Sequence, residues 1–124
     1  MDVIHAAIRV SDLEQSREYY GDALGLEEHR SFTLDGVENV FLGGEHGEIQ
    51  LRYEADREPP EPDREDFDHV AVSVDDTDAV FERVVEETGC EVLTPPTTIG
   101  DAGVRIAFIE DPDGYAVELV GSTD

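Results

Sequence analysis

The chain has 124 residues, of which 32 are Asp or Glu and only 8 are basic, giving a formal net charge of −24 at pH 7. This length suits one domain, or two half-domains that share a core. The acidity argues against binding to nucleic acid or to an anionic membrane, because both require cationic patches. Every basic residue is Arg and none is Lys, a bias that favours a halophilic protein whose self-repulsion is screened by salt.

The first half of the chain predicts a βαβββ unit. Residues Val3 to Val10 alternate between apolar and polar, as a strand does. Ser11-Asp12 is a helix-capping signal and Gly25 is the matching helix stop. Three more strands are expected, the first two joined by the hairpin signal Asp35-Gly36, at residues 27–34, 37–42 and 48–53.

The second half predicts the same order of elements. A strand at 70–74 precedes a helix from Thr77 to Thr88, which Gly89 ends. Further strands are expected at 90–93, 104–109 and 115–120, with Pro95-Pro96 breaking the first of these. The expected organisation is one domain over 1–124, with module 1 at 1–54, a charged, Pro-rich linker at 55–67, and module 2 at 68–124.

An internal repeat links the two halves. The segment His5-Ala-Ala-Ile-Arg-Val-Ser-Asp12 recurs 64 residues later as His69-Val-Ala-Val-Ser-Val-Asp-Asp76. Gln50 and Glu118 are also repeat-equivalent, each a polar residue flanked by aliphatic residues at the centre of the last strand of its copy. Pseudo-symmetry could therefore bring two imidazoles and two side-chain oxygens to one place. This pattern favours a divalent metal site made by His5, Gln50, His69 and Glu118, with open positions for water or substrate.

The sequence also predicts where the protein works. Cys90 is its only cysteine, so no internal disulfide can form, which fits a reducing compartment. No apolar run approaches the roughly 18 residues of a membrane span. The chain enters a strand pattern at once, without a secretory signal. We therefore expect a cytoplasmic protein.

The sequence resembles the vicinal oxygen chelate superfamily, and most closely its small glyoxalase I branch. The resemblance covers the whole chain. It rests on the two His-containing segments, on Tyr19-Tyr20 with Leu24-Gly25-Leu26, and above all on Phe108-Ile-Glu-Asp-Pro-Asp-Gly-Tyr-Ala-Val-Glu118-Leu. It implies an α+β fold of two tandem βαβββ modules that form a curved mixed sheet around one divalent ion.

The resemblance also implies an activity and a site. The metal ligands fall on His5, Gln50, His69 and Glu118, and the ion could be Ni, Co, Mn, Fe or Zn. Arg9 matches a residue that binds the thiol part of the substrate. The implied reaction is a lyase-type isomerisation, through an enediolate, of the hemithioacetal of methylglyoxal and a small thiol. Glu118 would transfer the proton, and a homodimer is expected.

Three positions depart from the glyoxalase I pattern. Gln50 stands where that branch usually has Glu, and the set with Gln is similar to that of methylmalonyl-CoA epimerase. Glu54 replaces an Asn, and a Lys is missing near Gly100. The last two positions contact glutathione in the family, so a smaller thiol is a possible substrate.

Other functions remain open at this stage. The first is a methylmalonyl-CoA epimerase that uses Glu118 and Glu38 on the two faces of the reacting carbon. The second is an Fe(II) ring-cleaving dioxygenase with His5, His69 and Glu118 as a 2-His-1-carboxylate triad. The third is a non-catalytic drug-binding resistance protein, against which the four polar positions argue.

Overall fold

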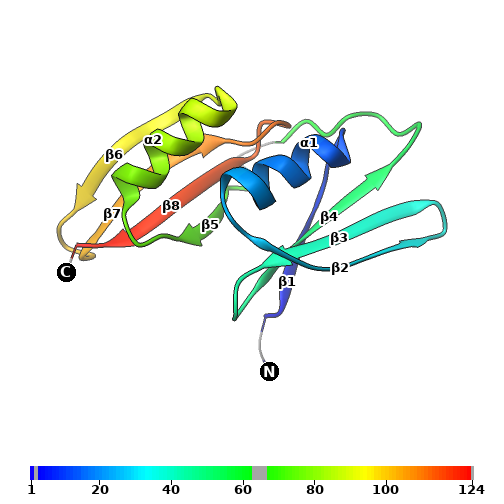
Figure 1. The fold of residues 1–124 in the computed structure, drawn as a ribbon, viewed down its shortest axis with the longest axis horizontal. Coiled ribbons are helices and arrows are strands. Elements are labelled where there is room, and N and C mark those ends of the chain that lie inside the picture. The colour runs from blue at the N-terminus through cyan, green and yellow to red at the C-terminus, as the bar shows by residue number, and fades with distance from the viewer. Residues whose placement is uncertain (2, 63–66, 124) are drawn as a thin grey trace. The chain divides into compact units, whose positions relative to one another are not determined.

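The computed structural model describes residues 1, 3–62 and 67–123 and divides them into two compact units, Met1–Pro60 and Glu61–Asp124 (Figure 1). Each unit contains one four-stranded mixed sheet and helical turns packed on it, which confirms the α+β fold and the two βαβββ copies. Residues 63–66 of the expected linker lie outside the described residues. No helix in the described ranges is both long and apolar enough to cross a membrane.

Unit 1 is built in the expected order. Its elements are β1 (His5–Arg9), α1 (Leu13–Arg17), the π-helical segment η1 (Glu18–Ala23), β2 (Glu27–Leu34), β3 (Val37–Gly43) and β4 (Glu48–Glu54). The strand order in the sheet is β1-β4-β3-β2, with β1 parallel to β4 and the other pairs antiparallel.

The helical part of unit 1 differs from the expected uninterrupted helix. Asp12 caps the first turn, since its carboxylate accepts a hydrogen bond from the Gln15 backbone N–H at 3.0 Å. The chain then widens into a π-helical turn, in which the Leu24 N–H donates to the Tyr19 carbonyl at 2.9 Å. This turn accompanies the burial of two adjacent side chains, Tyr19 and Tyr20. Hydrophobic periodicity at 3.6 residues per turn could not indicate such a change of pitch.

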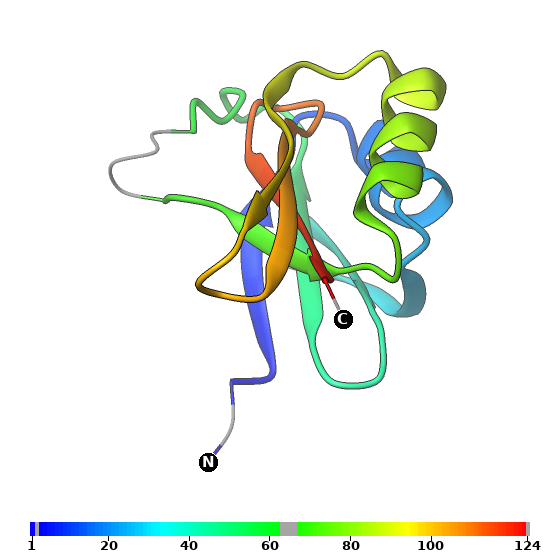
Figure 2. The same cartoon turned by 90° about the vertical axis from the view of Figure 1, so that its left-hand side faces the viewer.

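Unit 2 repeats the topology. Its elements are β5 (Val70–Ser73), α2 (Thr77–Thr88), β6 (Val92–Ile99), β7 (Val104–Glu110) and β8 (Ala116–Ser122). The strand order is β5-β8-β7-β6, again with the first pair parallel. Gly89 ends α2 in the left-handed conformation, with φ of 67°, as the sequence indicated. Helix α2 lies against one face of this sheet, as both views show (Figures 1 and 2).

The expectation that Pro95-Pro96 breaks the strand is wrong. Strand β6 continues through both prolines to Ile99, with register irregularities between Val92 and Thr94 and between Thr94 and Thr97. The prolines are tolerated because β6 is the edge strand of its sheet and they lie within a bulge, where no ladder donor is lost.

The spacing between equivalent residues of the two copies is larger at their last strands than at their first strands, and this increase has a structural cause. His5 and His69 are 64 positions apart, whereas Gln50 and Glu118 are 68 apart. The difference accumulates in connections: the turn at 100–103 is longer than its counterpart at 35–36, the bulge of β6 contains an extra residue, and the loop at 111–115 is longer than that at 44–47. The ladders that β4 and β8 form with their neighbours keep the same register in both units.

In each unit the core forms between the helical layer and one face of the sheet. Unit 1 buries Tyr20, Leu42 and Leu51 completely or nearly so, and unit 2 does the same with Val84, Val117 and Leu119. Because strand side chains alternate, the neighbouring residues along β4 and β8 point to the opposite face. Gln50 and Glu118 are therefore presented on the faces that the helices do not cover.

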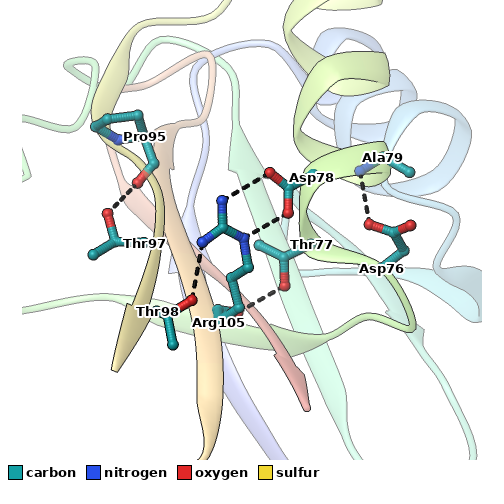
Figure 3. Close-up of polar contacts among 8 residues, drawn as sticks. All are labelled: Asp76, Thr77, Asp78, Ala79, Pro95, Thr97, Thr98 and Arg105. Atoms are coloured by element: carbon teal, nitrogen blue, oxygen red, sulfur yellow. Dashed lines mark hydrogen bonds and ion pairs between the residues drawn. The ribbon is translucent and has the colours of Figure 1, made fainter. Parts of the chain in front are cut away.

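A polar clamp attaches the start of α2 to its sheet (Figure 3). The Arg105 guanidinium donates two hydrogen bonds to Asp78, at 2.6 and 3.0 Å, and a third to Thr98 Oγ1 at 3.0 Å. The Thr77 hydroxyl donates to the Arg105 carbonyl at 2.7 Å. Gly121 allows this close approach, since a Cβ there would lie 2.5 Å from the Thr77 hydroxyl oxygen.

Candidate metal centre

The candidate ligands of unit 1 lie on adjacent parallel strands. His5, Ala7 and Arg9 alternate along β1, and their ladder partners on β4 are Glu48, Gln50 and Arg52. All six share one sheet face, opposite the face that carries the buried Ile49 and Leu51. The structure thus brings His5 and Gln50 onto one surface, as the repeat predicted.

An aromatic ring lies beside His5. The His5 imidazole and the Phe41 ring form a T-shaped pair, with ring centroids 5.3 Å apart and an angle of 81° between the planes. Phe41 is also the direct ladder partner of Gln50. His5 Nδ1 is buried and has no hydrogen-bond partner. A buried ring nitrogen without a partner is costly unless another group satisfies it.

The Gln50 side chain is held by a buried neighbour on β3. Its Nε2 donates to Asn39 Oδ1 at 2.8 Å, and Asn39 Nδ2 in turn donates to the Val37 carbonyl at 3.0 Å. Asn39 is only 5% exposed. The Gln50 carbonyl oxygen is thereby the part of the amide that remains available to a cation.

In unit 2 a histidine and a carboxylate are in direct contact. His69 lies immediately before β5, and its Nε2 is 3.0 Å from Glu118 Oε1 on β8. Its other ring nitrogen, Nδ1, is 2.6 Å from Asp68 Oδ1. A carboxylate on the second ring nitrogen fixes the orientation of the imidazole, as is common for metal-bound histidines. The rings of Phe108 and His69 form a T-shaped pair, with ring centroids 5.2 Å apart and an angle of 85° between the planes.

The two units contain the same local arrangement. Ala7 is paired with Gln50 and Ala71 with Glu118, and each alanine follows its histidine by two residues. Phe41 and Phe108 occupy equivalent ladder positions opposite these two residues. Sequence reasoning missed the two phenylalanines, although aligning the repeats would have shown them. It also missed Asn39 and Asp68, because the equivalent positions of the other copy carry apolar residues.

The donor set fits a divalent ion of the first transition series. Each unit contributes one imidazole and one side-chain oxygen, which suits Ni, Co, Mn, Fe or Zn, and the buried His5 Nδ1 lacks another partner. Within residues 1, 3–62 and 67–123, no three His, Cys, Asp or Glu side chains gather into a group that could hold an ion. Each unit by itself offers two of the four candidate ligands.

A fixed negative charge lies on the same face of unit 1. Glu48, the ladder partner of His5, is 2.6 Å from His29 Nδ1 and 3.5 Å from Arg30 Nη1. The hydrogen bond from His29, aided by the charge of Arg30, lowers the pKa of Glu48 below its ordinary value of 4.5. Glu48 is thus held as a carboxylate near the candidate ligands.

Arg9 lines a small cavity at the end of β1. The cavity has a volume of about 80 Å³ and is also lined by Arg52, Glu54 and Glu58. Arg9 and Arg52 are ladder partners, so two guanidinium groups project from the same face. The Arg9 Nη1 donates to the Glu58 carbonyl at 3.2 Å. Two cationic groups side by side in an otherwise acidic chain suit an anionic ligand group.

Known proteins resemble this chain along most of its length. The model of the Glyoxalase/Bleomycin resistance protein/Dioxygenase superfamily matches residues 3–119. The lactoylglutathione lyase of Haemophilus influenzae is 34% identical over 131 residues, covering 97% of this chain and 92% of the relative. The lactoylglutathione lyase of Salmonella typhimurium is 31% identical over 132 residues, covering 100% and 95%.

Solved structures are similar as well. Glyoxalase I of Leishmania major, described as trypanothione-dependent, superposes with a TM-score of 0.80 at 28% identity, covering 98% of this chain and 86% of that one. Glyoxalase I of Zea mays gives a TM-score of 0.79 at 26% identity, covering 98% of this chain. The chain spans only 45% of the length of the maize protein.

Proposed function

The chain belongs to the Glyoxalase/Bleomycin resistance protein/Dioxygenase superfamily, and we propose that it is a metal-dependent lyase of the glyoxalase I type. Its substrate would be the hemithioacetal of methylglyoxal and a small thiol, and its role the detoxification of methylglyoxal. The observation that carries this proposal is the contact of His69 Nε2 with Glu118 Oε1 at 3.0 Å. An imidazole and a carboxylate side by side provide both a metal half-site and a base.

His5, Gln50, His69 and Glu118 would hold one divalent ion. A bound ion would supply Lewis-acid chemistry, which would make the reacting C–H of the substrate more acidic. The rings of Phe41 and Phe108, packed against the two imidazoles, would limit the access of water to the ligands. Asp68 keeps the Nδ1 side of His69 occupied, so that Nε2 faces the ion.

Glu118 would transfer the proton. Its side chain is 18% exposed and flanked on β8 by the fully buried Val117 and Leu119, so the carboxylate is partly desolvated. It would remove the proton from C1 of the hemithioacetal and return it to C2. Glu118 is the only carboxylate among the four proposed ligands, and the Gln50 amide cannot act as a base. Glu118 would therefore perform both proton transfers.

Arg9 would bind the anionic end of the thiol. The cavity beside Arg9 and Arg52 favours a carboxylate there. Glu54 at the same cavity would repel a second carboxylate. We therefore favour a thiol smaller than glutathione, bound through a single carboxylate.

The assembly and setting belong to the same proposal. We propose one domain over 1–124 that forms a homodimer, with His5 and Gln50 of one chain and His69 and Glu118 of the other completing each metal site. Mixing His5→Ala chains with Glu118→Ala chains would then regain activity at one of two sites, whereas a fully active monomer would contradict the dimer.

A halophilic cytoplasm suits the acidic surface and the single free Cys90.

The methylmalonyl-CoA epimerase alternative has less support. Epimerisation needs acid–base groups on both faces of the reacting carbon, and Glu38 was the candidate for the second group. Glu38 alternates with Asn39 along β3 and therefore points to the sheet face opposite Gln50. Within the described residues, we find no feature that favours the ring-cleaving dioxygenase or the drug-binding resistance protein over the lyase.

A substrate panel tests the proposal. The metal-loaded protein is mixed with methylglyoxal and, in separate reactions, with cysteine, γ-glutamylcysteine or glutathione, and thioester formation is measured. Methylmalonyl-CoA is tested in parallel by the exchange of its α-hydrogen with deuterium. We expect a thioester with at least one small thiol and no exchange. Exchange without thioester formation would identify an epimerase instead.

A further inference from the structure

Two hydrogen bonds in series determine which way the Gln50 amide faces. Asn39 Nδ2 lies 3.0 Å from the Val37 carbonyl oxygen, and Asn39 Oδ1 lies 2.8 Å from Gln50 Nε2. The Val37 carbonyl can only accept, so Asn39 must turn its NH₂ group towards it. The Asn39 oxygen then faces Gln50 and also can only accept, so Gln50 must present its own NH₂ group.

This order leaves the Gln50 Oε1 atom on the opposite side of the amide. Gln50 makes no other side-chain hydrogen bond within the described part of the chain. An amide has one ligating atom, its oxygen, because the NH₂ group offers hydrogens and no available lone pair. A flipped Gln50 would place those hydrogens against a cation. The orientation of the amide therefore decides whether Gln50 is able to bind a metal.

The second copy of the repeat has no polar residue equivalent to Asn39. The ladder places Asn39 diagonally across from Gln50, and it places Ile106 at the same position relative to Glu118. Both residues are buried, at 5% and 7% exposure. A carboxylate has two equivalent oxygens and presents one in either orientation. The polar neighbour thus occurs only beside the ligand that needs to be oriented.

We propose that Asn39 is a positioning residue that locks the Gln50 amide with its oxygen towards the metal. The proposal rests on the proposed function in taking Gln50 as a metal ligand. It also gives a physical reason for Gln at position 50: a Glu there would set a carboxylate against Asn39 Oδ1, and Asn39 cannot turn round without losing its bond to Val37. Asn39 therefore selects an amide ligand over a carboxylate.

Metal affinity measures this role without any catalytic turnover. The full-length protein is stripped of metal and titrated with Ni²⁺ by calorimetry, in the wild type and in Asn39→Ile, which copies the second repeat. We expect the dissociation constant to rise about 10–100-fold, the usual effect of removing a group that orients a ligand. Gln50→Ala should cause a loss at least as large.

Thr77→Val is the matched control. Thr77 is also buried and also donates to a backbone carbonyl, but it lies in the clamp of α2. The substitution Thr77→Val should lower the melting temperature of the protein and leave its Ni²⁺ affinity unchanged. Wild-type affinity in Asn39→Ile, together with a loss in Gln50→Ala, would overturn the proposal and reduce Asn39 to a structural residue.

A second measurement contains one arm that does not depend on how well Asn39→Ile folds, namely Gln50→Glu with Asn39 intact. Gln50→Glu is made in the wild type and in the Asn39→Ile background. We expect the added carboxylate to strengthen Ni²⁺ binding at least about tenfold more in the Asn39→Ile background, where no oxygen opposes it. Equal effects in both backgrounds would contradict the proposal. So would a gain of tenfold or more for Gln50→Glu alone with Asn39 intact.

The outcomes separate this proposal from the lyase. Unchanged Ni²⁺ affinity in Gln50→Ala would overturn the ligand role of Gln50 and with it the role of Asn39, yet thioester formation by the wild type would still establish the lyase. Conversely, if the Ni²⁺ affinities follow the expected pattern but the wild type forms no thioester, the positioning role of Asn39 would be supported and the proposed lyase activity would be wrong.

Discussion

Gln50 and Glu118 occupy the same position in their two sheets. Each lies on the last strand of its unit, directly opposite an alanine that follows a histidine by two residues. Each is also the ladder partner of a phenylalanine whose ring forms a T-shaped pair with that histidine. The two sites differ in charge, since one holds an amide and the other a carboxylate. If both are ligands, as proposed, Gln50 is suited only to binding, and Glu118 to binding and proton transfer.

The change Glu118→Gln should nearly abolish turnover. The substitution keeps the size of the side chain and one ligand oxygen, but it removes the basic group. Loss of a general base costs typically about 10²–10⁴-fold, and we expect the upper end because the same carboxylate serves both proton steps. Steady-state kinetics with metal content measured in the same sample tests this. Near-normal turnover with metal bound would place the base elsewhere.

The change Asp68→Asn should weaken metal binding modestly. Asp68 contacts His69 Nδ1 at 2.6 Å but is 80% exposed. Water screens such a contact, so we expect a rise in the Ni²⁺ dissociation constant at or below the low end of the usual range, about tenfold. The exposed Asp75, for which no ion pair or hydrogen bond is present in the described ranges, provides the control Asp75→Asn. A loss of 100-fold would mean that Asp68 is itself a ligand.

The Asp78–Arg105 clamp should make stability depend on pH below about 4. The hydrogen bonds from Arg105 lower the pKa of Asp78 below its ordinary value of 3.8. A lowered folded-state pKa gives stabilisation that is complete above the unfolded value and is lost as the pH falls through the folded one. Asp78→Asn should therefore reduce the melting temperature at pH 7 and have a smaller effect at pH 3. An effect of constant size across this range would show that the charge of Asp78 is irrelevant.

Salt should stabilise the protein. The net charge of −24 causes self-repulsion, and raising KCl from about 0.1 M to about 3 M shortens the screening distance from about 10 Å to below about 3 Å. Melting temperatures should climb over this range. A flat or falling trend would remove the halophilic interpretation and leave the lyase untouched.

The placement of the candidate ligands within each unit could be anticipated because it depends on register. Alternation along a strand and a repeated offset indicate that His5 lies with Gln50 and His69 with Glu118, as the structure shows. Their role as metal ligands stays a prediction. The helix stop at Gly89 follows equally from local chemistry, because glycine adopts the left-handed conformation at no steric cost.

Other features depend on contacts that a linear pattern does not contain. The bond between Asn39 and Gln50 runs diagonally across two strands, so it appears only once the β3–β4 register is known. Strand β6 continues through Pro95-Pro96 because it lies at the sheet edge, and edge position is a property of the whole sheet. The π-helical turn at Tyr19 likewise accompanies the burial of Tyr19 and Tyr20, which the linear pattern does not contain.

The most direct test of the central claim is a metal titration of the stripped protein, with thioester formation from methylglyoxal and its best thiol as the readout. We expect almost no product without metal, and a rise with added Ni²⁺ to a plateau at one ion per set of His5, Gln50, His69 and Glu118. The double variant His5→Ala/His69→Ala should give no plateau. Full thioester formation by the stripped protein, or by that variant, would contradict the account.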